Sequence, residues 1–253
     1  EFIKALPTRP LVAAFTATAT PEVRQDIIRR LDIPGASIVC TGFDRPNLHF
    51  AVQRTRDKDR SLLEFLRKHD KQCGVIYCAT RSKVESVTQQ LQRHGFKALR
   101  YHAGLTPEER RNNQNAFVGG LVPLIVATNA FGMGIDKADV RFVVHYNMPK
   151  DVESYYQEAG RAGRDGLESE CLLLYDKADI AVNTYLIGHD QPDLAWKAHE
   201  MELLQKMTFY CNTSGCLRRV LLEYFGEKAP AKCNHCGNCD ANKNASWRRF
   251  LDI

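Results

Sequence analysis

The chain has 253 residues, of which 44% are hydrophobic and 26% are charged, so it can bury a core and is not disordered throughout. A guide of about 150 residues per domain gives one to two domains. The net charge of +5 permits a polyanionic partner without requiring one. No apolar run approaches the roughly 18–20 residues of a membrane span, and residues 1–20 carry no secretory signal, so we expect no membrane partner.

The first fifty residues predict one strand, one helix and a connector. The apolar run Leu11–Phe15 predicts a strand, and because it lies so early and no initiator Met precedes it, we expect the chain to begin in mid-protein. Thr20-Pro21 is a favoured pair for the N-cap and first residue of a helix, which we expect to end at Leu31. Residues 43–50 predict a connector, since Pro46 interrupts regular structure on both sides.

From about residue 60 onward, strand-like runs alternate with helical patterns, which indicates βαβ units and a parallel sheet. The predicted strands are Gly74–Ala79, Lys97–Tyr101, Val122–Ala127, Arg141–Tyr146 and Cys171–Tyr175. Helices are predicted over 62–66 and after two capping boxes, Ser82–Glu85 and Thr106–Glu109. After Asp176 the strand pattern stops, and 177–188 and 194–210 predict helices. The expected fold class is α/β, a doubly wound parallel sheet followed by a small, mostly helical region.

The nine cysteines are an odd number, which argues against the disulfide framework of a secreted protein. Four of them share the spacing C-x16-C-x2-C-x2-C: Cys216, Cys233, Cys236 and Cys239. Two-residue gaps let successive thiolates turn onto one ion, and the fourth closes a tetrahedron, so the spacing predicts a structural Zn²⁺ site. A redox CxxC pair is the alternative, and Cys211 and His235 are substitute ligands.

One basic segment combines a glutamine with two arginines. In a predicted helix over 154–164, the side chains of Gln157, Arg161 and Arg164 lie at positions i, i+4 and i+7 and share one face. Two glycines inside this helix cost roughly 1 kcal/mol each relative to alanine, which predicts close approach of another backbone or of a phosphate. Two guanidiniums on one face suit a triphosphate, and a solvated basic helix end is the alternative.

Polar residues also follow the ends of three predicted strands, the edge at which open α/β sheets bind ligands. These residues are Arg81, Ser82, His102, Thr128 and Asn129. Arginine or serine at a helix N-terminus can bind a phosphate. Taken singly, each residue is more typical of an ordinary cap than of a ligand contact.

Taken together, these segments closely resemble the motifs of the RecQ family of DNA helicases, within the second helicase superfamily. The matching segments, in chain order, are Thr16–Ala19 (motif III), Phe43–Asn47 (the crossing between lobes), Ile76–Glu85 (motif IV), Val126–Val140 (motif V), Tyr155–Gly166 (motif VI) and Leu217–Glu227 with the cysteines after it. The resemblance implies four parts: the end of a first RecA-like lobe (1–41), a second RecA-like lobe (42–178), a RecQ-type zinc-binding domain (179–243) and a truncated linker (244–253).

The resemblance also implies roles for individual residues. Arg164 is expected to be the arginine finger that reaches the γ-phosphate of ATP, with Arg161 and Gln157 assisting it. Gly134 and Asp136 are expected to contact the nucleotide or to link motif V to it. The phosphates of a DNA strand are expected to lie against Arg81, Ser82, His102, Thr128 and Asn129.

The implied function is part of an ATP-dependent 3′-to-5′ DNA helicase that unwinds duplex DNA in recombination and repair. Its expected partners are DNA, as a single strand and at a duplex junction, ATP with Mg²⁺, and the upstream RecA-like lobe of the same protein. The chain contains neither G-x-x-x-x-G-K-[ST] nor an Asp-Glu-x-His motif, so we expect it not to hydrolyse ATP alone.

Two other functions stay open at this point: a non-catalytic, zinc-stabilised DNA-binding or scaffolding module, and an RNA helicase. We expect an intracellular protein that resides with the chromosome, in the cytoplasm or nucleoid of a bacterium or in the nucleus of a eukaryote.

Overall fold

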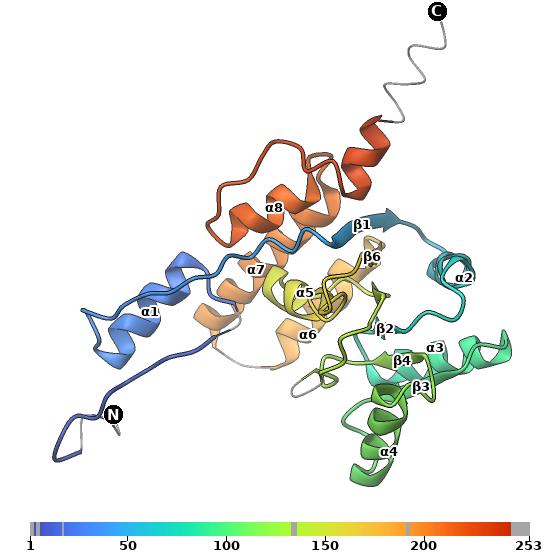
Figure 1. Cartoon of the computed structure of the whole chain (residues 1–253), viewed down its shortest axis with the longest axis horizontal. Helices are drawn as coiled ribbons and strands as arrows, with labels where there is room; N and C mark the ends of the chain where they lie inside the picture. The colour runs from blue at the N-terminus through green and yellow to red at the C-terminus, as the bar shows by residue number, and fades with distance from the viewer. Residues whose placement is uncertain (1–2, 4–5, 17, 133–135, 191–192, 244–253) are drawn as a thin grey trace, which may run out of the picture.

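A computed structural model of the chain describes residues 3, 6–16, 18–132, 136–190 and 193–243. A parallel sheet in the order β1-β6-β5-β2-β4-β3 forms its centre (Figure 1). Its strands are β1 (Leu48–Arg54), β2 (Gly74–Tyr77), β3 (Ala98–Tyr101), β4 (Leu124–Ala127), β5 (Phe142–His145) and β6 (Ser169–Tyr175). The parallel order confirms the predicted α/β class.

One helix, α1, precedes the first strand, and other helices connect strands or follow the last one. They are α1 (Pro21–Leu31), α2 (Lys58–Lys68), α3 (Arg81–Arg93), α4 (Pro107–Val118), α5 (Val152–Ala159), α6 (Ala178–Asp190), α7 (Leu194–Asn212) and α8 (Leu217–Tyr224). Within the described chain, no helix is both long and apolar enough to cross a bilayer.

Hydrophobic cores lie on both faces of the sheet, because successive side chains of a strand point to opposite faces. Val75 and Tyr77 of β2 face one core, which also contains residues of α5, α7 and α8. Ile76, between them, faces the other core with α2 and α3. The buried Cys236 belongs to the first core, so the cysteine-rich segment packs directly on the sheet.

Local helix signals agree with the structure at two of three predicted caps. Thr20 caps α1, which spans the predicted residues, and Thr106 caps α4. The capping box predicted at Ser82 is wrong, because the side chain of Thr80 accepts the hydrogen bond from Lys83 N–H at 3.2 Å. Ser82 therefore lies in the first turn of α3 and is exposed.

Two strand predictions are wrong. Residues 11–15 form no strand, and Leu11 and Phe15 are fully exposed, because no neighbouring strand in the described part of the chain pairs with them. The segment predicted as a connector contains the start of β1, which pairs with β6 along its whole length. Pro46 lacks an N–H group but precedes the first paired residue, Leu48, so it leaves the ladder intact.

Candidate functional site

The segment that carries the two arginines is a helix end followed by a loop. The predicted helix over 154–164 is wrong in its second half, since α5 ends at Ala159 and Gly160 caps it. Gly163 has φ +56°, and a Cβ there would lie 2.5 Å from Asn47 Nδ2 and 2.8 Å from the Leu167 carbonyl oxygen. The sequence predicted close approach of another backbone or of a phosphate at these glycines, and Gly163, which lies beyond the helix, is approached by the Asn47 side chain and the Leu167 carbonyl.

Two of the predicted catalytic side chains contact distant segments of the chain. Gln157 Nε2 donates to Thr18 Oγ1 at 2.7 Å, which joins the end of α5 to the segment before α1. Arg161 Nη1 donates to the Gly132 carbonyl oxygen at 2.7 Å, in the loop after β4. The structure therefore brings together the three segments that sequence reasoning assigned to motifs III, V and VI.

Arg164 pairs with an acidic residue of the same loop after β4. Its Nη1 lies 3.0 Å from Asp136 Oδ1, and the two side chains are 37% and 88% exposed. Ion pairs this exposed are weak, so a phosphate can replace the carboxylate as the partner of the guanidinium. Gly134, the other predicted nucleotide contact, lies outside the described residues.

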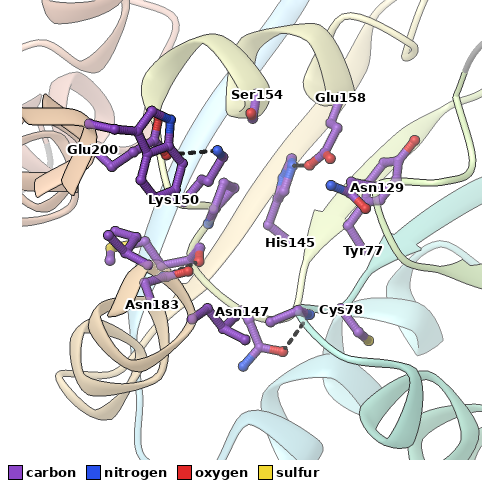
Figure 2. Close-up of a pocket in the computed structure, with 16 residues that line it drawn as sticks. Tyr77, Cys78, Asn129, His145, Asn147, Lys150, Ser154, Glu158, Asn183 and Glu200 are labelled. Atoms are coloured by element: carbon purple, nitrogen blue, oxygen red, sulfur yellow. Dashed lines mark hydrogen bonds and ion pairs between the residues drawn. The ribbon is translucent and has the colours of Figure 1, made fainter. Parts of the chain in front are cut away.

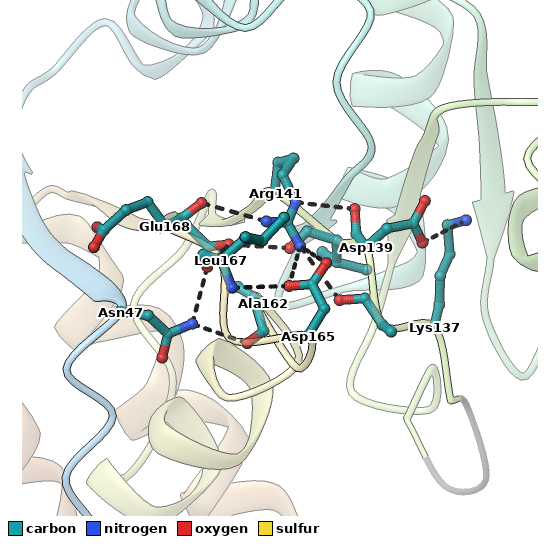
Figure 3. Close-up of polar contacts among 12 residues, drawn as sticks. Asn47, Lys137, Asp139, Arg141, Ala162, Asp165, Leu167 and Glu168 are labelled. Atoms are coloured by element: carbon teal, nitrogen blue, oxygen red, sulfur yellow. Dashed lines mark hydrogen bonds and ion pairs between the residues drawn. The ribbon is translucent and has the colours of Figure 1, made fainter.

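The loop after α5 is held by side chains that sequence reasoning did not select. Asn47 Nδ2 donates to the carbonyl oxygens of Gly163 and Leu167, each at 2.9 Å (Figure 3). Arg141 Nη2 lies 2.6 Å from both carboxylate oxygens of Asp165, and this hydrogen bonding lowers the pKa of Asp165. The sequence analysis identified Phe43–Asn47 only as a motif between lobes. Nothing in the sequence indicated that Asn47 binds the loop after α5.

The predicted phosphate-binding residues lie at the carboxyl ends of three neighbouring strands. Thr128 and Asn129 follow β4, while Arg81 and Ser82 open the helix after β2. Because β2, β4 and β3 are adjacent, their ends meet, and a Cβ on Gly104 after β3 would lie 3.4 Å from Arg81 Cδ. Arg81, Ser82 and Asn129 are exposed, whereas Thr128 is 9% exposed.

His102 differs from the other predicted contacts because it is buried and both of its ring nitrogens have partners. Nδ1 accepts from the Gly104 N–H at 3.2 Å, so Nε2 carries the proton and donates to Glu85 Oε1 at 2.8 Å. Burial favours the protonated form of Glu85, but hydrogen bonds from Arg100 and His102 hold its pKa below the ordinary value. His102 thus shapes the loop after β3.

A cavity of about 260 Å³, lined by both polar and apolar side chains, lies outside the carboxyl ends of β2 and β5 (Figure 2). β4 and β5 flank β2 on opposite sides, the kind of switch point at which open α/β sheets bind ligands. His145 Nε2 lies 2.9 Å from Glu158 Oε2 on one wall, and Lys150 Nζ lies 2.8 Å from Glu200 Oε2 on another. Asn129 lines the same cavity, which places it beside the strand-end residues.

The four predicted zinc ligands form one cluster. Their sulfur atoms all lie within 4.8 Å of one another, and Sγ of Cys233 and Sγ of Cys239 are 4.0 Å apart. Four thiolates around one Zn²⁺ at about 2.3 Å place the sulfurs about 3.8 Å apart, so the donor set fits zinc. Backbone N–H groups of the same loop donate to Cys216 Sγ and Cys233 Sγ, each at 3.3 Å. With four protein ligands the site has no open position, which makes it structural.

Comparisons with known proteins match both halves of the chain. The family described as helicase conserved C-terminal domain matches residues 57–166, and the family described as RecQ zinc-binding matches residues 177–240. The chain is 46% identical over 237 residues to the ATP-dependent DNA helicase RecQ of Bacillus subtilis, which covers 94% of this chain and 40% of that protein. It is 39% identical over 249 residues to the ATP-dependent helicase SGS1 of Saccharomyces cerevisiae, covering 97% of this chain and 17% of the relative.

A solved structure shares the fold. The structure described as S. cerevisiae Dbp5 bound to RNA and ADP BeF3 superimposes with a TM-score of 0.61 at 20% sequence identity, over 81% of this chain and 56% of that one. The chain spans less than half the length of the RecQ and SGS1 relatives.

Proposed function

Because this chain belongs to the RecQ family of helicases, we propose that it supplies the second RecA-like lobe and the zinc-binding domain of an ATP-dependent 3′-to-5′ DNA helicase. In this proposal residues 1–41 end a first lobe, 42–178 form the second and 179–243 form the zinc-binding domain. The observation that carries it is a pair of contacts around the loop after α5. Gln157 donates a hydrogen bond to Thr18, and Arg164 pairs with Asp136.

Residues 160–166, which carry Arg161 and Arg164, form what we call the arginine loop. ATP hydrolysis requires that this loop face a nucleotide on the upstream lobe. ATP and Mg²⁺, when bound there, supply the phosphoanhydride and the cation that neutralises its oxygens. Arg164 exchanges the Asp136 carboxylate for the γ-phosphate as the lobes close, while Arg161 stays anchored to Gly132. The hydrogen bond from Gln157 to Thr18 couples movement of the second lobe to the motif III segment as the lobes close.

The strand-end residues hold the phosphates of one DNA strand. Exposed Arg81 supplies charge, and the N-terminus of α3 supplies N–H groups and a positive dipole end. Such contacts bind without reading sequence, which suits translocation along a strand and its duplex junction. We also propose that the protein is intracellular, because nine cysteines, four of them clustered as metal ligands, do not fit the disulfide framework of a secreted protein.

The experiment that tests this function is DNA-stimulated ATP hydrolysis by a protein that joins this chain to its upstream ATP-binding lobe. Arg164→Ala should lower the rate about a thousandfold or more. Arg219→Ala is the matched control, because Arg219 pairs with Glu223 one turn away on the same helix and with no other acidic residue among those the structure describes. A full rate in Arg164→Ala, or hydrolysis by this chain alone, would overturn the assignment of the arginine finger.

DNA binding is tested by its salt dependence. Arg81→Ala should weaken binding equally for all sequences and lower the slope of log affinity against log salt by about one. Arg60→Ala is the control, because Arg60 is exposed on α2 and pairs with Glu64. Faster unwinding of RNA than of DNA duplexes would favour an RNA helicase, and DNA binding without ATP turnover by the two-lobe protein would favour a scaffolding module.

A further inference from the structure

The segment Phe43–Asn47 lies between the zinc-binding region and the arginine loop, and it is anchored on both sides. The Phe43 ring stacks on Phe225 with centroids 4.5 Å apart and meets Tyr156 of α5 edge-on at 6.1 Å. Its backbone N–H donates to Glu227 Oε1 at 2.7 Å, and its carbonyl oxygen accepts from the Tyr156 hydroxyl. The segment therefore cannot shift relative to either neighbour without breaking contacts.

Arg45 binds the end of α5. Its guanidinium donates to the carbonyl oxygens of Gly160 at 3.2 Å, Ala162 at 3.1 Å and Gly163 at 3.0 Å. The last carbonyls of a helix lack partners within it and form the negative end of its dipole, so a planar cation with several donors caps them well. These three carbonyls flank Arg161 and precede Arg164.

Arg218 binds the backbone of the same segment from the opposite side. Its side chain is 7% exposed, and Nη1 lies 2.6 Å from Asp44 Oδ1 and 2.7 Å from the Arg45 carbonyl oxygen. Nη2 donates to the Leu48 carbonyl oxygen at the start of β1. Arg218 is the second residue of α8, whose N-cap is the zinc ligand Cys216. The zinc site thus fixes the place from which Arg218 reaches Arg45.

We propose that Arg218 and Arg45 are positioning residues that connect the zinc site to the arginine finger. Cys216 fixes the start of α8, Arg218 fixes the main chain at Arg45, and the Arg45 guanidinium fixes the carbonyls around the arginine loop. The inference rests on the proposed role of Arg164. A loop with glycines at three of its positions, Gly160, Gly163 and Gly166, has little intrinsic preference for one conformation, so this external support decides where Arg164 points.

The first test measures backbone amide exchange in this chain with zinc bound. Arg45→Met should speed exchange of the amides of residues 160–166 at least tenfold, and Arg45→Lys should speed it less than Arg45→Met because the ammonium keeps the charge and its N–H donors without the planar fork. Arg218→Met should affect the same amides, whereas the control Arg219→Met should leave them unchanged. Unchanged exchange in Arg45→Met, or equal acceleration in this loop and in α3, would overturn the inference.

The second test measures ATP hydrolysis in the two-lobe protein. Arg45→Met should lower kcat about 10- to 100-fold, because a shift of about 1 Å in a catalytic group costs that much. The KM for ATP and nucleotide-free DNA affinity should change less than about twofold, since neither depends on the position of the finger. If Arg164→Ala lowers kcat and Arg45→Met does not, the inference falls and the proposed function stands. A full rate in Arg164→Ala overturns both.

Discussion

Thr18 and Gln157 are separated by 139 positions in the chain, yet Thr18 Oγ1 accepts a hydrogen bond from Gln157 Nε2 at 2.7 Å. Both residues are outside the hydrophobic core, so the contact contributes little to stability. It instead connects the segment before α1 to the helix that precedes the arginine loop, and a contact between the exposed Gln157 and the half-buried Thr18 is easily broken and re-formed as lobes move.

Loss of this contact should uncouple ATP turnover from DNA. In the two-lobe protein, Gln157→Ala and Thr18→Val should each lower the DNA-stimulated rate about tenfold, and the double variant should lower it no further, because both remove one interaction. Gln89→Ala, an exposed glutamine of α3, is the control. Fully additive effects of the two changes would show that the pair does not act as a unit.

Gly163 should tolerate no side chain. Its φ of +56° and the 2.5 Å approach to Asn47 Nδ2 combine backbone strain with a steric clash, so Gly163→Ala should lower the free energy of unfolding by about 2–4 kcal/mol. Gly166→Ala is a matched control with φ +82° and no atom within 4 Å of the added Cβ, and it should cost about 1 kcal/mol. Urea unfolding of both variants gives the comparison, and equal losses would contradict the clash.

Metal removal should unfold the C-terminal region. A four-thiolate zinc site contributes on the order of 10 kcal/mol to folding, so a strong chelator or Cys236→Ser should abolish the cooperative melting of α8 and lower solubility without changing base preference. Cys40→Ser is the control, because Cys40 is exposed and outside the cluster. An intact melting transition after zinc removal would contradict a structural role.

The pair formed by His69 and Glu170 should make stability depend on pH. Their Nε2 and Oε1 atoms lie 3.3 Å apart, and the hydrogen bond to Glu170 raises the pKa of His69 above 6.5 while the same bond lowers the pKa of Glu170 below 4.5. The histidine contribution is complete below pH 6.5 and is lost as pH rises through its folded pKa. The glutamate contribution is complete above pH 4.5 and is lost as pH falls through its folded pKa.

The difference in unfolding free energy between the wild type and His69→Gln should therefore be largest between about pH 4.5 and 6.5 and should shrink by pH 8. Denaturant unfolding at several pH values measures it. His94→Gln serves as the control, because His94 is exposed at the end of α3 and its ring bonds to the backbone carbonyl of Gln90, one turn earlier on the same helix. A difference that grows toward pH 8 would contradict the sign.

Features coded by near neighbours were predictable from the sequence. The bounds of α1 follow from Thr20-Pro21 at its start, and the four-cysteine cluster follows from two-residue gaps between ligands. The carboxyl end of β4 was predicted at the observed residue, Ala127, and that of β2 two residues beyond the observed Tyr77, so Arg81 and Thr128 lie at the expected edge of the sheet.

Features that depend on distant partners were decided only by the tertiary structure. The helix predicted to reach Arg164 ends at Ala159, where Arg45, 115 residues away from Gly160, donates to the Gly160 carbonyl oxygen. β1 forms despite Pro46 because β6 provides a hydrogen-bonded neighbour for it, while residues 11–15 gain none in the described chain. A helix end or a strand needs partners for its backbone groups, and when those partners are far away in the chain, local residue preferences do not specify the outcome.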